Sequence, residues 1–185
     1  MSKQSNLWAQ PKSKWLLGIP VGAFLALVMG VVGTVGFNTV IHATSSEAFC
    51  TNCHVPGYAA EEFQLSVHGT NATGYKVACA DCHVPKDFMG KMWRKITAMR
   101  EVYWQVQGDY NTPEGYQAHK KEMQKNIIEG FRANDSKACR NCHDVNQMNF
   151  KKQKKMAAKM HQRMDKMKKT CIDCHKGKIA HKKAK

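Results

Sequence analysis

The chain has 185 residues, a formal net charge of +15 and 43% hydrophobic residues. This composition fits one modest folded domain and excludes a disordered chain. The excess charge lies at the C-terminal end, because residues 151–185 are rich in lysine with Asp165 and Asp173 as their acids, whereas basic and acidic side chains balance within residues 45–150. A basic patch often serves phosphates, but no nucleic-acid-binding motif accompanies these lysines, so we expect no nucleic-acid partner.

The first predicted element is a membrane span. Residues 15–41 form an uncharged run, mostly Leu, Val, Gly, Ala and Phe. A helix of about 20 apolar residues crosses a bilayer, whereas the apolar part of a cleaved signal peptide is about 7–15 residues long. The length of the run favours a retained single-pass anchor in the lipid bilayer, and cleavage after Ala43 is the alternative.

Basic residues before this span set its predicted orientation. Lys3, Lys12 and Lys14 lie within residues 1–14, which contain no acidic residue. Positive charges beside a span favour the cytoplasmic side. We therefore predict that residues 1–14 are cytoplasmic and that residues 42–185 lie outside the inner (cytoplasmic) membrane, in the periplasm of a bacterium with two membranes.

Four copies of the motif Cys-x-x-Cys-His use all eight cysteines of the chain. The motif residues are Cys50, Cys53 and His54; Cys79, Cys82 and His83; Cys139, Cys142 and His143; and Cys171, Cys174 and His175. In this motif the two thiols form thioethers to a haem and the histidine ligates its iron. A zinc site does not demand a histidine after each cysteine pair, and a dithiol redox site needs one pair in a βαβ setting. The sequence therefore predicts four covalently bound haem c groups.

The spacing of the motifs indicates an internal repeat. They begin at residues 50, 79, 139 and 171, so two short spacings of similar length flank a much longer one. His68 precedes the second motif by nearly the same interval as His161 precedes the fourth. A duplication into two dihaem halves is the simplest explanation.

Helices dominate the predicted secondary structure. The sequence predicts helices at 87–107, 114–132 and 147–168 and a turn at 134–136, and no alternating strand pattern of useful length is present. We predict a mainly α fold in which a single N-terminal transmembrane helix precedes a small multihaem c-type cytochrome domain of two dihaem halves. Few apolar residues remain for a core, so we expect the porphyrins to supply much of it.

The second axial ligand decides what each iron can do, because an iron with two histidines passes electrons whereas an open iron can meet a small molecule. The histidines outside the motifs are His42, His68, His119, His161 and His181. We expect His68, His161 and His181 to be distal ligands and His119 to be a solvated helix position. One iron then lacks a histidine. Methionines are an alternative, but most of them lie in predicted helices, where packing is the more common role.

These motifs carry a family resemblance. It rests on the anchor and on the segments 49–54, 79–85, 134–143, 157–161 and 170–177 with His181. The chain resembles the NapC/NirT family of membrane-anchored tetrahaem c-type cytochrome quinol dehydrogenases, which includes the NapC, NrfH and CymA types. The segment 150–181 most resembles the NapC branch, which is linked to nitrate reductase.

The resemblance implies a function. The first haem takes electrons from a membrane quinol, menaquinol or ubiquinol, and the others carry them to a periplasmic terminal reductase. In the NapC branch this partner is nitrate reductase or its cytochrome subunit. The distal histidines of the family match His68, His161 and His181. A lysine and an acid that line the quinol site of the family match Lys95 and Glu101.

Quinol oxidation releases protons as well as electrons, so a proton acceptor must lie beside the ring hydroxyl. Glu101 suits this role, and Lys95 suits a hydrogen bond to the ring oxygen. The two residues are about 120° apart around a helix, so both can border one pocket, with Lys91 and Arg94 nearby. The alternative is a solvated helix with a surface ion pair between Glu101 and Arg94 or Lys95.

The first motif departs from the family pattern. Several members have a methionine just after this motif that can ligate the first haem, whereas Val55 and Pro56 follow His54 here. Either His54 or another group is then the axial ligand. We expect no strong ligand on the opposite side, where Glu101 is a candidate.

Three other functions stay open. The first is a general electron-transfer hub that serves several periplasmic reductases. The second is a multihaem reservoir without its own quinol site. The third is a reductase that acts on a small oxyanion at the first haem. In the last case Lys91 and Lys95 would supply the cationic pocket.

Overall fold

The computed structural model describes residues 8–9, 19–52, 54–71, 73–108, 112–176 and 179–182, with the backbone but not the side chains of residues 54–56. The basic residues before the anchor, the first part of the predicted span, Cys53 and the imidazole of His54 lie outside the described residues. The chain divides into two compact units, Met1–Thr44 and Ser45–Lys185.

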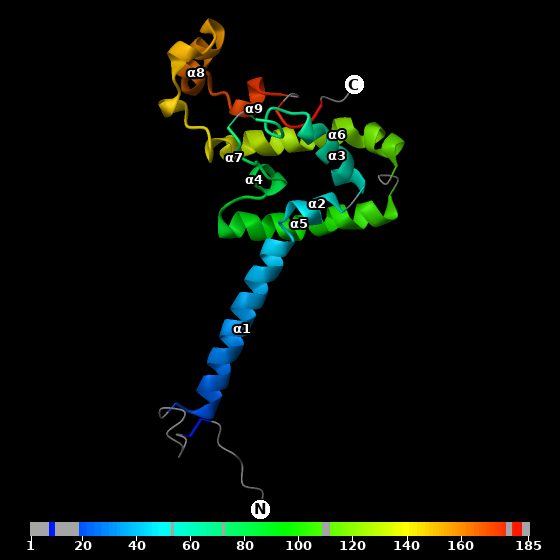
Figure 1. Ribbon diagram of the computed structural model, residues 1–185, viewed down its shortest axis with the longest axis vertical. Helices are drawn as coiled ribbons and strands as arrows, with labels where there is room; N and C mark the ends of the chain where they lie inside the picture. The colour runs from blue at the N-terminus through cyan, green and yellow to red at the C-terminus, as the bar shows by residue number, and fades with distance from the viewer. Residues whose placement is uncertain are drawn as a thin grey trace, which may run out of the picture. The chain divides into compact units, whose positions relative to one another are not determined.

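The helix of the first unit is α1, Val21–Ala43 (Figure 1). It is long and apolar enough to cross a membrane, and none of its residues is buried within the chain. Asn38 Nδ2 donates to the Thr34 carbonyl at 2.8 Å, and Thr39 Oγ1 donates to the Val35 carbonyl at 2.8 Å. Because a bilayer offers no water to such groups, this internal bonding suits a helix in lipid. The helix α1 fits the predicted single-pass anchor.

The second unit is built from helices, and no strand occurs among its described residues. Its elements are α2 (Glu47–Thr51), α3 (His54–Gln64), α4 (Cys79–His83), α5 (Phe88–Gln107), α6 (Pro113–Ala133), α7 (Lys137–Arg140), η3 (Val145–Gln147), η4 (Phe150–Lys152), α8 (Lys155–Met167) and α9 (Cys171–Cys174). The predicted mainly α fold is confirmed. The helices predicted at 87–107 and 114–132 are α5 and α6.

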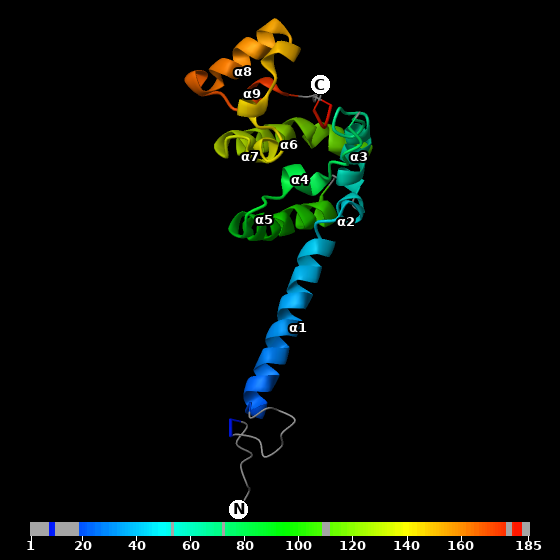
Figure 2. The same ribbon diagram turned by 60° about the vertical axis from the view of Figure 1, so that its left-hand side comes forward.

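The two long helices, α5 and α6, begin at capping residues. The Asp87 side chain accepts a hydrogen bond from the Gly90 N–H at 2.8 Å, and Thr112 accepts one from the Gly115 N–H at 3.1 Å. Pro113 follows Thr112 at a position where a missing N–H costs nothing. Figures 1 and 2 show that α5 and α6 run in opposite directions with α4 between them, and that α8 lies beyond α6 on the side away from α5.

The helix predicted at 147–168 is wrong over its first part, because α8 begins only at Lys155. Two single turns of 3-10 helix, η3 and η4, precede it. The side chains of Asp144 and Asn149 each accept a hydrogen bond from the backbone N–H two residues on, at 2.9 and 3.1 Å. Local bonds of this kind compete with a continuous helix.

The predicted turn at 134–136 is confirmed, and it ties the third motif to the fourth. Asp135 and Ser136 adopt left-handed conformations, with φ of 53° and 51°. Ser136 is fully buried, and its hydroxyl accepts a hydrogen bond from the Ile172 N–H at 3.2 Å. The turn therefore brings α7 and α9 together.

Several motif cysteines lie in single turns of helix, which bring residues i and i+3 to one side. Cys79 and Cys82 of α4 are placed in this way. Asp81 and Asp173 hold the same position in the second and fourth motifs, and each carboxylate accepts a hydrogen bond from the backbone N–H of the residue before its motif, at 3.0 and 2.9 Å. This repeated cap supports the predicted duplication.

The apolar core of the second unit is small. Among the described residues, the buried hydrophobic side chains are Phe63, Tyr116 and Met164. So little buried apolar surface supplies only a small part of the stability that a domain of this size needs. The sparse core fits the expectation that bound cofactors complete it.

Candidate haem-binding centres

Three pairs of imidazole rings face each other in the second unit. Their ring centroids are 6.1 Å apart for His68 and His143, 5.9 Å for His161 and His175, and 6.1 Å for His83 and His181. Each pair joins one motif histidine to one of the three predicted distal histidines. The structure thus brings all three predicted distal residues to motif histidines.

The separation within each pair fits a metal ion between two axial imidazoles. A metal–imidazole bond is about 2 Å long, which puts two rings on opposite sides of one metal about 6 Å apart. Among the described residues, no group of three or more His, Cys, Asp or Glu side chains could hold a metal ion. Each pair thus offers two imidazoles, the number of axial positions that a haem iron has.

Each distal histidine is fixed by a hydrogen bond at Nδ1. His68 Nδ1 donates to the Ile179 carbonyl at 2.9 Å, His181 Nδ1 donates to the Ala59 carbonyl at 3.1 Å, and His161 Nδ1 donates to Gln153 Oε1 at 2.8 Å. A bond at one ring nitrogen sets the tautomer and leaves the other nitrogen as the metal ligand. In all three rings Nε2 is therefore the nitrogen left to bind a metal.

Burial keeps the second-motif pair in the neutral form that binds metal. Burial, with smaller contributions from His181 and Arg94, lowers the pKa of His83 to about 4. Burial also lowers the pKa of His181, against a smaller opposing effect of its hydrogen bond to Ala59. Neutral imidazole is the form that ligates a metal.

The thiols show that consecutive motifs are neighbours in space. Among the described cysteines none forms a disulfide. Burial raises the pKa of Cys79, and Cys50 of the first motif contributes to the increase. Burial likewise raises the pKa of Cys82, with a contribution from Cys142 of the third motif. Burial raises the pKa of Cys139 to about 11, with a contribution from Cys171 of the fourth motif. The four motifs are therefore arranged in space in the same order as in the sequence.

Two of the three ring pairs join residues from different predicted dihaem halves. His68 of the first half faces the third motif, and His181 of the second half faces the second motif. Only the pair of His161 and His175 lies within one half. The halves are therefore interleaved into the single unit Ser45–Lys185. The repeat pattern in the sequence did not indicate that a histidine of one half would face a motif of the other half.

A polar cluster that sequence reasoning missed holds the C-terminal segment on α3 and α6. Glu62 forms an ion pair with Lys120 and also accepts a hydrogen bond from the Lys182 N–H at 3.1 Å. Burial raises the pKa of Tyr116 to about 12, and Glu62 contributes by its charge and by a hydrogen bond. Gln124 Nε2 donates to the Lys182 carbonyl at 2.6 Å. The residue next to His181 is therefore fixed on both sides of its backbone.

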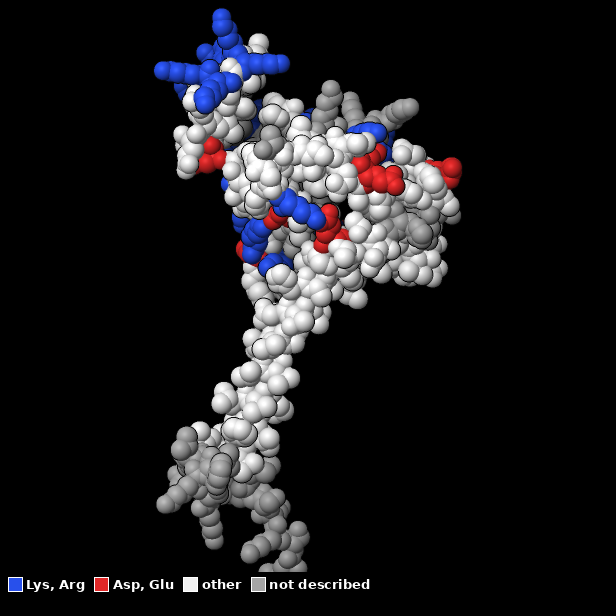
Figure 3. Space-filling model, in the orientation of Figure 1, with Lys and Arg blue, Asp and Glu red and all other residues white. Residues whose placement is uncertain are grey.

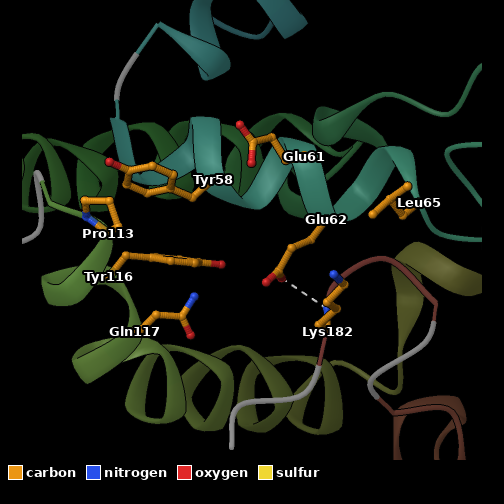
Figure 4. Close-up of a pocket in the computed structure, with 8 residues that line it drawn as sticks. All are labelled: Tyr58, Glu61, Glu62, Leu65, Pro113, Tyr116, Gln117 and Lys182. Atoms are coloured by element: carbon orange, nitrogen blue, oxygen red, sulfur yellow. Dashed lines mark hydrogen bonds between the residues drawn. The ribbon is translucent and has the colours of Figure 1, made fainter.

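Beside this cluster lies a cavity of about 220 Å³ (Figure 4). Its lining residues come from α3, α6 and the C-terminal segment: Tyr58, Glu61, Glu62, Leu65, Pro113, Tyr116, Gln117 and Lys182. Glu62 points toward Lys182, whereas Glu61 points away from it. The signal for the cluster is weak in the sequence, because Glu62 and Lys120 are two of many charged residues on helices.

The helix α5 carries both predicted quinol-site residues, Lys95 and Glu101, but they have different neighbours. Arg94 donates two hydrogen bonds to the Glu101 carboxylate, at 3.0 and 2.9 Å, and the Glu101 side chain is 62% exposed. This is the surface ion pair that the sequence left open as the alternative to a quinol site. Arg94 and Glu101 both lie close enough to His83 to influence its pKa. Burial lowers the pKa of Lys95, and Cys50 opposes this decrease. Lys95 therefore lies near the first motif and Glu101 near the second.

Chains that combine this covalent motif with pairs of axial imidazoles are c-type cytochromes, which serve electron transfer, and α1 adds a candidate membrane anchor. The sequence pattern of the NapC/NirT cytochrome c family, N-terminal region, matches residues 11–185. This chain belongs to the NapC/NirT cytochrome c family, as the resemblance in the sequence indicated.

Named relatives agree with this membership. The cytochrome c-type protein NapC of Haemophilus influenzae is 45% identical over 174 residues, which cover 94% of this chain and 85% of that protein. The cytochrome c-type protein NapC of Escherichia coli (strain K12) is 40% identical over 178 residues, 96% of this chain and 88% of that protein. The denitrification system component NirT of Stutzerimonas stutzeri is 38% identical over 176 residues, 95% of this chain and 86% of that protein. No solved structure matches the chain.

Proposed function

We propose that this chain is a membrane-anchored tetrahaem cytochrome that oxidises a membrane quinol, menaquinol or ubiquinol, and delivers the electrons to a periplasmic terminal reductase. The resemblance to the NapC branch makes nitrate reductase or its cytochrome subunit the proposed partner, and the relatives named NapC agree with that branch. One observation carries the proposal: the histidines of the second, third and fourth motifs each face one of the three predicted distal histidines. None of these three is therefore left as a second ligand for the first motif.

The proposed haem sites follow from the motifs and the ring pairs. Each motif holds one haem through its two thiols, and bound haem supplies a carrier of single electrons. The axial pairs are His83 with His181 at the second motif, His143 with His68 at the third and His175 with His161 at the fourth. His54 serves the first motif, whose opposite side is then available to a substrate.

Residues of α5 provide the proposed quinol chemistry, with Lys95 on the side of the first motif and Glu101 on the side of the second. Lys95 lies near Cys50 of the first motif, where its ammonium group is placed to hold a ring oxygen and to stabilise developing negative charge. Glu101 takes the proton that quinol oxidation releases. The two hydrogen bonds from Arg94 fix the orientation of the carboxylate, and its exposure lets water carry the proton away.

The outer surface of α5 suits contact with a membrane interface, from which a quinol would arrive. Its exposed large apolar side chains are Phe88, Met89, Trp93, Ile96, Met99, Val102, Tyr103, Trp104 and Val106. Aromatic residues of this kind are enriched at membrane–water interfaces, and an apolar surface of this extent is unusual on a protein that meets only water. The lysines before the span favour a cytoplasmic N-terminus and a second unit in the periplasm.

Quinol-dependent reduction without any partner protein tests the function. The purified full chain is mixed anaerobically with a menaquinol analogue, and haem absorbance is followed by stopped flow. We expect reduction to proceed without nitrate, nitrite or a reductase. If dithionite reduces the haems and the quinol does not, the chain is a reservoir. If nitrite or nitrate alone reoxidises the reduced protein at a turnover rate, it is a small-oxyanion reductase.

A further inference from the structure

The helix α8 and the residues beside it form a concentrated basic surface. The segment 151–169 is rich in basic residues and contains Asp165 as its acid. The basic residues are all exposed: Lys151, Lys152, Lys154, Lys155, Lys159, Arg163, Lys166, Lys168 and Lys169. We call these nine residues the α8 basic face. Figure 3 shows lysine and arginine side chains projecting together from this end of the unit.

Many cations elsewhere in the unit form ion pairs with neighbours, whereas those of the α8 basic face do not. The ion pairs among the described residues use Lys76, Lys86, Arg94, Lys120, Arg132, Lys137 and Arg140, and none involves a member of the α8 basic face. Like charges crowded on one short segment of chain repel one another. Such a surface costs stability unless something outside the unit complements it.

The helix α8 has two opposite faces. At about 100° per residue, Lys155, Lys159 and Arg163 lie along one side of the helix. His161 and the buried Met164 lie on the other side. The charged groups of Lys155, Lys159 and Arg163 thus lie on the side of α8 away from the ring pair.

The inner face of α8 supplies the distal ligand proposed for the fourth haem. The ring planes of His161 and His175 lie within 15° of each other, and His161 Nδ1 is held by Gln153 at 2.8 Å. A molecule on the basic face would be separated from this ring pair by about one helix diameter, ~10–12 Å. A molecule docked on the basic face would therefore lie close to the fourth motif.

We propose that the α8 basic face is the docking surface for an acidic face of the soluble electron-transfer protein that accepts electrons from this chain. This inference rests on the proposed function and names where its partner binds. All members of the face except Arg163 are lysines, which are strongly hydrated point charges. Such charges steer encounter and give transient complexes more than tight ones, which suits a carrier that must release its partner after each transfer.

A matched pair of variants tests the location of the docking surface. Lys155→Glu with Lys159→Glu reverses two exposed charges one helical turn apart on α8. Lys121→Glu with Lys125→Glu reverses two exposed charges with the same spacing on α6. Both variants change the net charge equally. The probe is an oxidised soluble c-type cytochrome of net negative charge, and the measurements are its dissociation constant for the full chain and its second-order rate of reduction by dithionite-reduced protein.

For the α8 variant we expect at least about 10-fold slower transfer and weaker binding at low salt, the usual scale for lost electrostatic steering. The wild-type rate should fall as ionic strength rises from roughly 0.01 to 0.5 M, because the screening length shrinks, and the α8 variant should lose most of this dependence. The α6 variant should stay within about threefold of wild type. Equal slowing of both variants would show a response to net charge alone, and an unchanged α8 variant would also overturn the proposal.

Quinol-dependent reduction of the same variants separates this inference from the proposed function. Both variants should be reduced by the quinol analogue at the wild-type rate, since neither change touches α5. Because the docking measurement starts from dithionite-reduced protein, it stays readable even if quinol oxidation fails. The two proposals therefore fail independently.

Discussion

Glu62 on α3 and Lys120 on α6 form a buried ion pair between residues 58 positions apart, with side chains 12% and 5% exposed. The same carboxylate also binds Tyr116 and the backbone N–H of Lys182, next to the proposed ligand His181. The pair therefore joins two helices and holds the segment that carries one axial histidine. Its removal should affect both stability and ligation.

The Glu62→Gln variant should be strongly destabilised, because it keeps the shape of the side chain but leaves Lys120 as an uncompensated buried charge. Breaking a buried pair in this way costs about 3–5 kcal/mol. Guanidinium unfolding followed by circular dichroism measures the loss. Electron paramagnetic resonance should also show a new high-spin ferric signal, as His181 is released from the second haem.

The neighbouring Glu61→Gln change is the matched control, since Glu61 points away from Lys182. It should alter the unfolding free energy by less than about 0.5 kcal/mol, as surface changes usually do. Adding Lys120→Met to Glu62→Gln should restore part of the lost stability, because no charge is then left buried. Equal stability of the Glu61 and Glu62 variants would show that the pair does not hold the fold.

Haem content follows directly from the motif count. Pyridine haemochrome analysis of denatured, washed protein should give about four haems per chain. Replacing Cys139 and Cys142 together with alanine should lower this to about three, because one motif loses both thioethers. A value of two or fewer in the wild type would contradict the tetrahaem proposal.

The ring pairs predict the ligation of each iron. His68→Met, His161→Met and His181→Met should each change a different low-spin signal in electron paramagnetic resonance, because the three residues face three different motifs. The oxidised wild type should also show one high-spin ferric haem, from the first motif. His42→Gln is the control and should leave every low-spin signal in place. Four low-spin signals in the wild type would exclude the open first site.

The proposed quinol site predicts a selective kinetic defect. Glu101→Gln keeps the size of the side chain but removes the proton acceptor, so quinol-dependent haem reduction should fall by about 10²-fold or more. Lys95→Met should weaken quinol binding and slow reduction. Dithionite reduction should stay fast in both variants, because it needs no proton acceptor. Stopped-flow absorbance measures both reactions.

Haem content and the low-spin signals should be unchanged in these two variants, which separates a lost quinol site from a damaged fold. Arg94→Leu gives a further comparison, since it removes the group that orients Glu101 without removing the base. Its rate should lie between those of wild type and Glu101→Gln. If Glu101→Gln oxidised quinol at the wild-type rate with all haems in place, the assignment of the base would be wrong.

The elements that were predicted well depend on short-range patterns. A Cys-x-x-Cys-His motif needs only one turn of chain to place its thiols and histidine, and an uncharged run indicates a membrane span by its length. The long helices α5 and α6 were likewise predicted, because helical hydrogen bonds join residues only four positions apart. The start of α8 was missed, since Asp144 and Asn149 favour local turns over helix there.

Patterns along the chain were enough to establish a c-type cytochrome with four haem motifs, a candidate anchor and three candidate distal histidines. Which histidine faces which motif was decided by the fold, because His68 meets His143 and His181 meets His83 across distances in the chain that no periodicity connects. The fold also decided that Glu62 of α3 binds Lys120 of α6. Charged side chains on a helix have several partners within reach, and the packing of the helices selects one.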